Sequence, residues 1–291
     1  MQDLISQLNR SGKRLSKGHR KIAQYIEEHY EKAAHMTAGK LAEAVGISDS
    51  TVVRFAAALG YEGYPQLLRA LQELVSHRLT AGQRMELAED MTPAQTLSTV
   101  LRSDVHNLRA TAEGLDPALF DRVVNRILGA RAIYVIGLRS AAPLAQFMGF
   151  YLNYIFDDVH LVSSGVADVF EEVARMRPGD VMIGISFPRY SSRTLEAMRF
   201  AKRCGAHVIA ITDGPMSPLC AVAEDSLTAR TEMASFVDSL TAPMAVINAV
   251  LVALGVQRRE ALAEHFRQLE AIWDTYAVYI EGEEGEADGD A

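Results

Sequence analysis

The chain has 291 residues, of which 49% are hydrophobic and 23% are charged, proportions typical of a globular protein. Its length favours two domains, and no apolar run approaches the ~20 residues that a membrane-spanning helix needs. The first residues lack the basic-then-apolar pattern of an export signal. The cysteines, Cys204 and Cys220, match neither a disulfide framework nor a zinc site. We therefore expect a cytoplasmic protein with reduced, buried thiols, no membrane partner, no metal and no other cofactor.

Charge is distributed unevenly along the chain. Residues 1–80 contain 11 Lys and Arg against 8 Asp and Glu, a net charge of +3, whereas the whole chain has −8 and the remainder therefore −11. A basic part on an acidic body is expected where one end of a protein meets nucleic-acid phosphates. The alternative is a solvated helix face. The dense basic cluster consists of Arg10, Lys13, Arg14, Lys17, Arg20 and Lys21.

Residues 15–74 are expected to be helical, with Ser16 capping the first helix. Within this region Leu41 and Val45 share one helix face, and Gly46 can take the left-handed conformation that ends a helix. Ser48 is a good N-cap for a second helix, whose apolar positions are Val52, Phe55 and Leu59. Two short helices joined by a tight turn predict a helix–turn–helix, whose second helix enters the major groove of DNA.

The second helix of this pair has a polar face that can read DNA. Residues at the N-terminal end of such a helix reach base edges. Arg54 can grip a guanine or a phosphate, and Ser50 and Thr51 can donate to either. The alternative is an ordinary helical hairpin whose polar face meets only water. The predicted DNA-binding residues are Lys40, Ser48, Asp49, Ser50, Thr51 and Arg54.

After the helix–turn–helix, the pattern predicts a helix over 66–79, a linker over 80–93 and a helix over 94–114. From residue 131 short apolar strands alternate with helices, which is typical of a doubly wound parallel sheet buried on both faces. The expected strands are 132–136, 159–162, 181–185 and 208–212, with a weak fifth strand near 226–228. The expected helices are 141–155, 166–176, 194–204, 241–254 and 259–279.

These patterns predict a fold with two parts. An all-helical DNA-binding domain over 1–79 is followed by a linker and connecting helix over 80–114. An α/β ligand-binding domain follows over 115–280. The last segment, 281–291, has six acidic residues and is expected to be disordered and solvated.

Ligands of such sheets bind at the carboxyl ends of the strands, beside helix N-termini. Two loops expected there, 137–140 and 186–194, combine hydroxyl and guanidinium groups. Hydroxyls, backbone N–H groups and the positive end of a helix favour phosphate or carboxylate, and arginines such as Arg193 can add bidentate hydrogen bonds. The alternative is helix capping by Ser and Thr alone. The predicted ligand-binding residues are Arg139, Ser140, Ser186, Arg189, Ser191, Ser192 and Thr194.

The chain resembles the RpiR/MurR family of bacterial transcriptional regulators. Residues 37–42, 51–55 and 59–64 are similar to the family's N-terminal helix–turn–helix, and residues 131 to about 255 to its SIS (sugar isomerase) domain. The resemblance implies a homodimer or higher homo-oligomer whose dimer contacts come from the SIS domain. It also implies a phosphosugar ligand.

The ligand loop departs from the family pattern Ile-Ser-x-Ser-Gly-x-Thr, whose hydroxyls hold the phosphate. Ser186 keeps the first serine, whereas Pro188 replaces the second serine, Arg189 the glycine and Ser191 the threonine. One hydroxyl is lost and a guanidinium is gained. The resemblance therefore implies an anionic, carbohydrate-type effector, either a phosphosugar or a sugar acid.

We expect a DNA-binding transcriptional regulator rather than an enzyme, with an affinity for its double-stranded operator that this effector controls. One alternative is a sugar-phosphate aldose–ketose isomerase with a helical appendage. Such an enzyme needs a base, for which the candidates are Glu171, Glu172, Glu232 and His160. A further alternative is a dimerisation module that binds no ligand.

Overall fold

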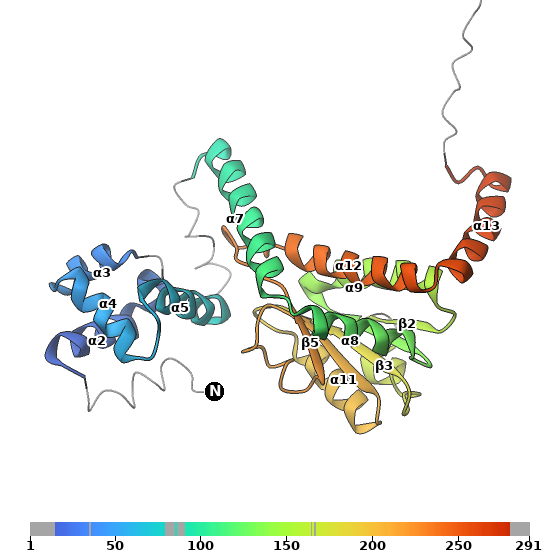
Figure 1. Cartoon of the computed structure of the whole chain (residues 1–291), viewed down its shortest axis with the longest axis horizontal. Coiled ribbons are helices and arrows are strands. Elements are labelled where there is room, and N and C mark those ends of the chain that lie inside the picture. The colour runs from blue at the N-terminus through green and yellow to red at the C-terminus, as the bar shows by residue number, and fades with distance from the viewer. Residues whose placement is uncertain are drawn as a thin grey trace, which may run out of the picture.

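The computed structural model of the protein describes residues 15–34, 36–78, 85, 91–163, 165 and 167–279. A group of helices, blue in Figure 1, precedes a sheet that is surrounded by helices. Three members of the predicted basic cluster, most of the predicted linker and the predicted acidic tail lie outside the described residues.

The amino-terminal helices share one hydrophobic core. Its large buried side chains include Ile22, Ile26, Phe55 and Leu67. Because each helix turns its apolar face towards this core, apolar residues recur at helical spacing in the sequence. Ser16 begins the first helix as predicted, because its hydroxyl accepts a hydrogen bond from the His19 N–H at 3.2 Å. The helices are α2 (Lys17–Ala33), α3 (Ala38–Val45), α4 (Asp49–Ala58) and α5 (Tyr64–Arg78).

The turn between α3 and α4 confirms the predicted helix–turn–helix. Gly46 has φ +70° and ends α3, and the Ile47 N–H donates to the Ala42 carbonyl at 2.9 Å. The segment before α3 is fixed by Tyr64, whose hydroxyl donates to the Met36 carbonyl at 2.7 Å. Burial raises the pKa of Tyr64 to about 12, so this phenol keeps its proton at neutral pH.

The second part contains a five-stranded parallel sheet of order β2-β1-β3-β4-β5. The predicted parallel sheet and its weak fifth strand are thereby confirmed. The prediction of burial on both faces was wrong for β2, an edge strand in which His160 and Leu161 are exposed. The strands are β1 (Ile133–Gly137), β2 (Val159–Val162), β3 (Val181–Ile185), β4 (His207–Thr212) and β5 (Asp225–Thr228).

Helices cover both faces of the sheet. One face packs against α8 (Pro117–Leu128), α9 (Ala142–Ile155) and α12 (Thr241–Gln257). The other packs against α10 (Val169–Glu172) and α11 (Ser192–Arg203). Helix α13 (Arg259–Thr275) follows α12 after a bend of 97°. Among the described helices none is by itself long and apolar enough to cross a membrane; α12 and α13 meet that test of length and composition only as a bent pair.

Two helices differ strongly from the prediction, and α13 ends at Thr275 rather than at the predicted residue 279. Helix α8 was missed, although Asp116 caps it and Pro117 occupies its first turn. The expected helix over 166–176 is reduced to α10, which begins after its N-cap Asp168; residues 173–175 form turns instead of continuing the helix. The thiols of Cys204 and Cys220, expected to be buried, are each partly exposed and form no disulfide.

Helix α7 (Pro93–Gly114) connects the two parts. Thr92 and Gln95 form a capping box at its start, and its carboxyl half packs against α12. In Figure 1 its amino-terminal half projects away from the sheet domain.

A buried carboxylate links the amino ends of β1 and β3. Asp180, at the start of β3, accepts a hydrogen bond from Arg131 Nη2 at 2.7 Å and one from the Arg177 N–H at 2.9 Å. The hydrogen bond from Arg131 to Asp180 raises the pKa of that guanidinium.

Candidate functional site

Five of the six predicted DNA-binding residues lie at the N-cap or in the first turns of α4, whereas Lys40 lies in α3. All are exposed except Thr51, which is half-buried. The Arg54 side chain lies along the helix, with Nε 3.2 Å from the Ser50 carbonyl oxygen and Nη2 3.5 Å from Thr51 Oγ1. The guanidinium is therefore held on the face that carries the two hydroxyls. Such a face can present donors to bases or phosphates.

Ser48 has a different role from the predicted one. It occupies the N-cap position with extended backbone, but its side chain caps no helical N–H. Its hydroxyl instead contacts the hydroxyls of Ser50 at 3.0 Å and Thr51 at 2.9 Å. The three hydroxyls form one cluster, because they follow one another around the first turn of the helix.

Positive charge lies beside this face. A Cβ atom on Gly18 would be 3.3 Å from Thr51 Cγ2, so the beginning of α2 is packed against the beginning of α4. Lys17, Arg20 and Lys21 on that part of α2 are exposed. The predicted basic cluster, as far as the structure describes it, thus adjoins the predicted recognition helix.

The second predicted site lies at the carboxyl edge of the sheet. Gly137 of β1 is the register partner of Ile185 of β3, so the loops after these strands begin side by side. Arg139 and Arg189 in these loops have φ +58° and +65°, in the left-handed region that favours glycine. Both side chains are exposed. Strained backbone of this kind is concentrated at functional sites.

The hydroxyls of the second loop organise its turn. Ser186 Oγ accepts a hydrogen bond from the Ser191 N–H at 3.1 Å, and Ser191 Oγ caps α11 by accepting from the Thr194 N–H at 3.2 Å. The Thr194 hydroxyl is buried without a partner among the described residues. Because a hydroxyl that accepts one hydrogen bond can still donate another, capping and ligand binding are compatible in Ser186 and Ser191.

A buried network beneath this loop was missed by the sequence analysis. The Tyr190 hydroxyl donates to Asp213 Oδ1 at 2.8 Å, and Thr212 Oγ1 lies 2.8 Å from the Ser186 carbonyl and 2.7 Å from Ser217 Oγ. Burial and the neighbouring carboxylate raise the pKa of Tyr190, which therefore remains a donor. The network holds the residues on either side of Arg189.

The remaining predicted ligand residues are less confined. Ser140 and Ser192 are exposed near the starts of their helices. Arg193 Nη1 lies 3.4 Å from Asp168 Oδ2, and its guanidinium carbon is 5.9 Å from the centre of the Phe170 ring. Arg193 is thereby drawn towards α10, and we assign it no part in the ligand site.

The four candidate catalytic bases lie apart from one another, and each makes its own contact with a different part of the structure. Glu171 completes the cap of α10, and Glu172 accepts a hydrogen bond from the Ser163 N–H at 2.9 Å. His160 lies at the sheet edge, where Nε2 is 2.7 Å from Asp158 Oδ1. Glu232 is held against α7. The structure therefore does not bring these four together.

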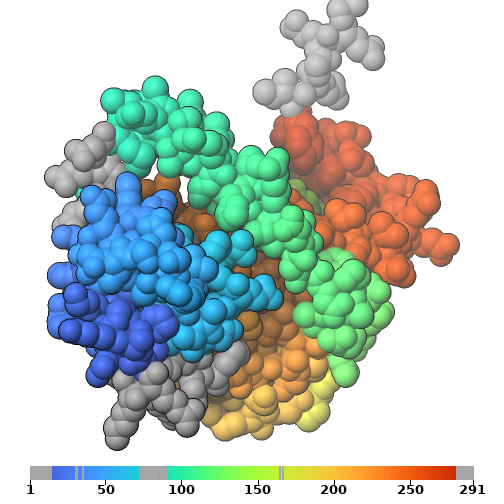
Figure 2. All heavy atoms as spheres, turned by 60° about the vertical axis from the view of Figure 1, so that its left-hand side comes forward, coloured from blue at the N-terminus to red at the C-terminus, as the bar shows by residue number. Residues whose placement is uncertain are grey.

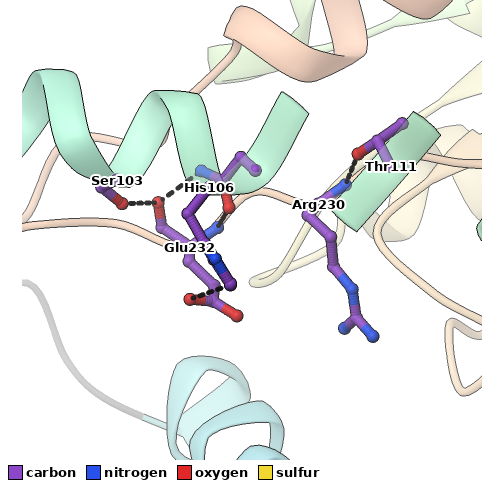
Figure 3. Close-up of polar contacts among 6 residues, drawn as sticks. Ser103, His106, Thr111, Arg230 and Glu232 are labelled. Carbon is purple, nitrogen blue, oxygen red and sulfur yellow. Dashed lines mark hydrogen bonds and ion pairs between the residues drawn. The ribbon is translucent and has the colours of Figure 1, made fainter. Parts of the chain in front are cut away.

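Helix α7 is attached to the loop after β5 by polar contacts (Figure 3). Asn107, fully buried, donates to the Glu232 carbonyl at 2.9 Å and accepts from the Glu232 N–H at 3.1 Å. Ser103 donates to the same carbonyl at 3.1 Å, and the Arg230 N–H donates to Thr111 Oγ1 at 2.9 Å. The loop begins at the carboxyl edge, so these contacts join that edge to the connecting helix.

Comparisons with known proteins identify both parts. Residues 2–78 match the helix–turn–helix domain of the rpiR family, and residues 126–253 match the SIS domain. The two matches together cover more than half of the chain. The chain belongs to the RpiR family of transcriptional regulators.

Two relatives of this RpiR-family chain span most of its length. The HTH-type transcriptional regulator HexR of Pseudomonas aeruginosa is 28% identical over 216 residues, which are 73% of this chain and 74% of HexR. The Vibrio vulnificus NanR protein complexed with ManNAc-6P has 20% identity and a TM-score of 0.57, covering 94% of this chain and 98% of NanR.

The SIS domain also has a solved relative. The sugar isomerase domain of an RpiR transcription factor from Sphaerobacter thermophilus is 28% identical with a TM-score of 0.59. It matches 61% of this chain and 99% of that structure. The predicted family, fold class and regulator function are therefore confirmed, while the roles of individual DNA- and ligand-binding residues stay predictions.

Proposed function

We propose that this RpiR-family protein binds an operator through α4 and that a small anionic carbohydrate derivative in its SIS domain controls that binding. The observation that carries the proposal is the face formed by the exposed Ser50 and Arg54 and the half-buried Thr51, beside the basic start of α2. Acting as a homodimer or higher homo-oligomer, it would read a palindromic site with two recognition helices.

The effector site is the carboxyl edge between the loops after β1 and β3. Ser186, Ser191 and the start of α11 supply donors to a phosphate or carboxylate. Arg139 and Arg189 add two exposed cations. A phosphosugar is supported by NanR, whose structure contains ManNAc-6P. Arg189, at the position of the family's glycine, also favours a sugar acid.

The route from effector to DNA runs through α7. The effector edge continues into the loop that Asn107 and Thr111 hold, and α7 leads back to the helix–turn–helix. An effector changes operator affinity only if it binds two arrangements of these parts unequally, and a coupling of ~1–3 kcal/mol is typical.

The DNA half of the proposal is tested by fluorescence-anisotropy titration of the purified protein with its own upstream DNA. We expect Arg54→Ala to weaken specific binding by roughly tenfold or more, since a guanidinium contact to a guanine contributes about 1–3 kcal/mol. Arg69→Ala, an exposed arginine on α5, is the control and should bind normally. Absence of sequence-specific binding by the unmodified protein would refute an operator-binding function.

The effector half is tested by adding phosphosugars, sugar acids and phosphorylated sugar acids to the preformed DNA complex. We expect at least one class to change affinity, and the double variant Ser186→Ala, Arg189→Ala to lose that response while keeping DNA binding. The control Arg199→Ala removes an exposed arginine that pairs with Glu196 on α11. Isomerase turnover that Glu232→Gln abolishes would instead support the enzyme alternative.

A further inference from the structure

Helix α7 buries polar residues and exposes apolar ones, which is the reverse of an ordinary amphipathic surface helix. The residues that it buries are polar, namely Asn107 and Thr111. Large apolar residues lie exposed on another side: Leu97 is 64%, Leu101 56%, Val105 46% and Leu108 37% exposed. A helix normally buries its apolar stripe. Figure 2 shows α7, turquoise to green, along the outer edge of the molecule.

The exposed apolar residues form one continuous line, which we name the α7 stripe: Ala94, Leu97, Leu101, Val105, Leu108 and Ala112. Their spacings of three and four residues keep them on one side of the helix. This line includes no charged residue. A contiguous apolar patch of this kind marks an interaction surface rather than scattered surface hydrophobics.

The stripe is nearly symmetric about residue 103. Reversing the helix places Ala94 opposite Ala112, Leu97 opposite Leu108, and Leu101 opposite Val105. An antiparallel pair of these helices, related by a two-fold axis near residue 103, would place each leucine or valine of one stripe against a leucine or valine of the other. We propose that the α7 stripe packs antiparallel against the α7 stripe of a second copy of this chain. The proposal rests on the homo-oligomer of the proposed function and assigns its interface to the connecting helix, which precedes the SIS domain from which the family resemblance implies the dimer contacts.

The surface beside α7 extends this interface. One helix stripe is smaller than the roughly 800 Å² that each partner buries in a typical stable dimer. A groove of about 860 Å³ adjoins α7 at Val100 and is lined by Phe236 and Val237 of the loop after β5. Phe236 is 55% and Val237 63% exposed. These side chains lie on the loop that α7 holds, so they supply further apolar area.

The first test measures the mass of the full chain by sedimentation equilibrium. We expect the unmodified protein to be a dimer or higher even oligomer, and Leu101→Glu with Leu108→Glu to raise the dimer dissociation constant by roughly a hundredfold or more. Both positions are exposed in the single chain, so the melting temperature of the dissociated variant should match that of dilute, dissociated unmodified protein.

The matched control is Val252→Glu with Val256→Glu, at two positions of α12 that are each 66% exposed. This control should remain oligomeric. An oligomer that survives the α7 changes, or one that dissociates only with the α12 changes, would overturn the assignment. So would a monomeric unmodified protein.

A second test fixes the direction of pairing. Leu97→Cys and Leu108→Cys in the same chain should form intermolecular disulfides under mild oxidation, because an antiparallel pair brings position 97 beside position 108 of the partner. Either substitution alone should not, since the two copies of Leu97 would be roughly 18 Å apart along the helix axis. Single variants also control for Cys204 and Cys220. Equal cross-linking of the single variants would contradict antiparallel packing.

Failure of this interface and failure of the proposed function give different results. Specific DNA binding by an unmodified protein whose oligomer ignores the α7 changes would leave the regulator intact and remove only the interface. A dimer that depends on α7 but recognises no DNA would support the interface and refute the operator-binding function.

Discussion

At the scale of single residues, the two left-handed arginines are the least ordinary feature of the sheet domain. A residue with a Cβ atom at such φ values costs about 1 kcal/mol or more relative to glycine. Arg189 is kept in this conformation by the contacts on both sides of it, from Ser191 to Ser186 and from Tyr190 to Asp213. The strain fixes the direction in which its guanidinium leaves the loop.

Arg189→Gly should therefore raise the free energy of unfolding by about 0.5–1 kcal/mol, because it removes the backbone strain. The same change should weaken the effector response, because it removes the cation. Arg199→Gly, inside α11, is the matched control and should destabilise by about 1 kcal/mol. Urea unfolding and effector titration measure the two effects. A destabilised Arg189→Gly protein with an unchanged effector response would show that the arginine is structural.

At the scale of elements, the attachment of α7 is unusual because it uses side chains on the helix and backbone on the loop. Asn107 satisfies both the N–H and the carbonyl of Glu232, as a neighbouring strand would. Asp104 Oδ1 additionally accepts from Ser239 at 2.6 Å, and Oδ2 from Thr241 at 2.9 Å. The position of the loop is thus tied to the position of the helix.

Asn107→Ala should lower the free energy of unfolding of the sheet domain by about 1–3 kcal/mol, because it leaves the Glu232 N–H unpaired. It should also reduce the effect of the effector on DNA affinity while leaving effector affinity nearly unchanged. Asn153→Ala is the control, since among the described residues that amide donates to the Gly149 carbonyl within its own helix. Calorimetry of the SIS unfolding transition and paired titrations provide the measurements. Full effector control in a destabilised Asn107→Ala protein would exclude this route.

Most elements could be predicted from sequence because their signals are local. Gly46 ends α3 within one turn, and the apolar runs of β1, β3 and β4 are continuous. Helix α8 was missed because the turn-forming Asp116 and Pro117 equally fit a helix end. The pairing of Asn107 with Glu232 and of Tyr190 with Asp213 could not be predicted, since it depends on packing between residues far apart in sequence.

At the scale of the whole molecule, charge separates the two parts. The first 80 residues are positive and the remainder is strongly negative. DNA is therefore attracted to one end and repelled by the body, which favours a single orientation of approach.

DNA affinity should accordingly fall steeply with salt, by about one unit of log–log slope for each phosphate contact. Lys17→Ala, beside the start of α4, should lower that slope by about one. Lys32→Ala, in the last turn of the same helix, should leave it unchanged. Anisotropy titrations between low and moderate salt give the slope. Equal slopes for the two variants would mean that DNA does not contact the start of α2.

The bond between Arg131 and Asp180 has a consequence for motion. It ties the entry of β3 to the residue that precedes β1, at the end of the sheet farthest from Arg139 and Arg189. From there β1 and β3 stay paired as far as Gly137 and Ile185, so the strands themselves have little freedom to move. Any displacement that a bound metabolite produces is therefore largest in the loops of the carboxyl edge, the same edge from which Asn107 receives its partner.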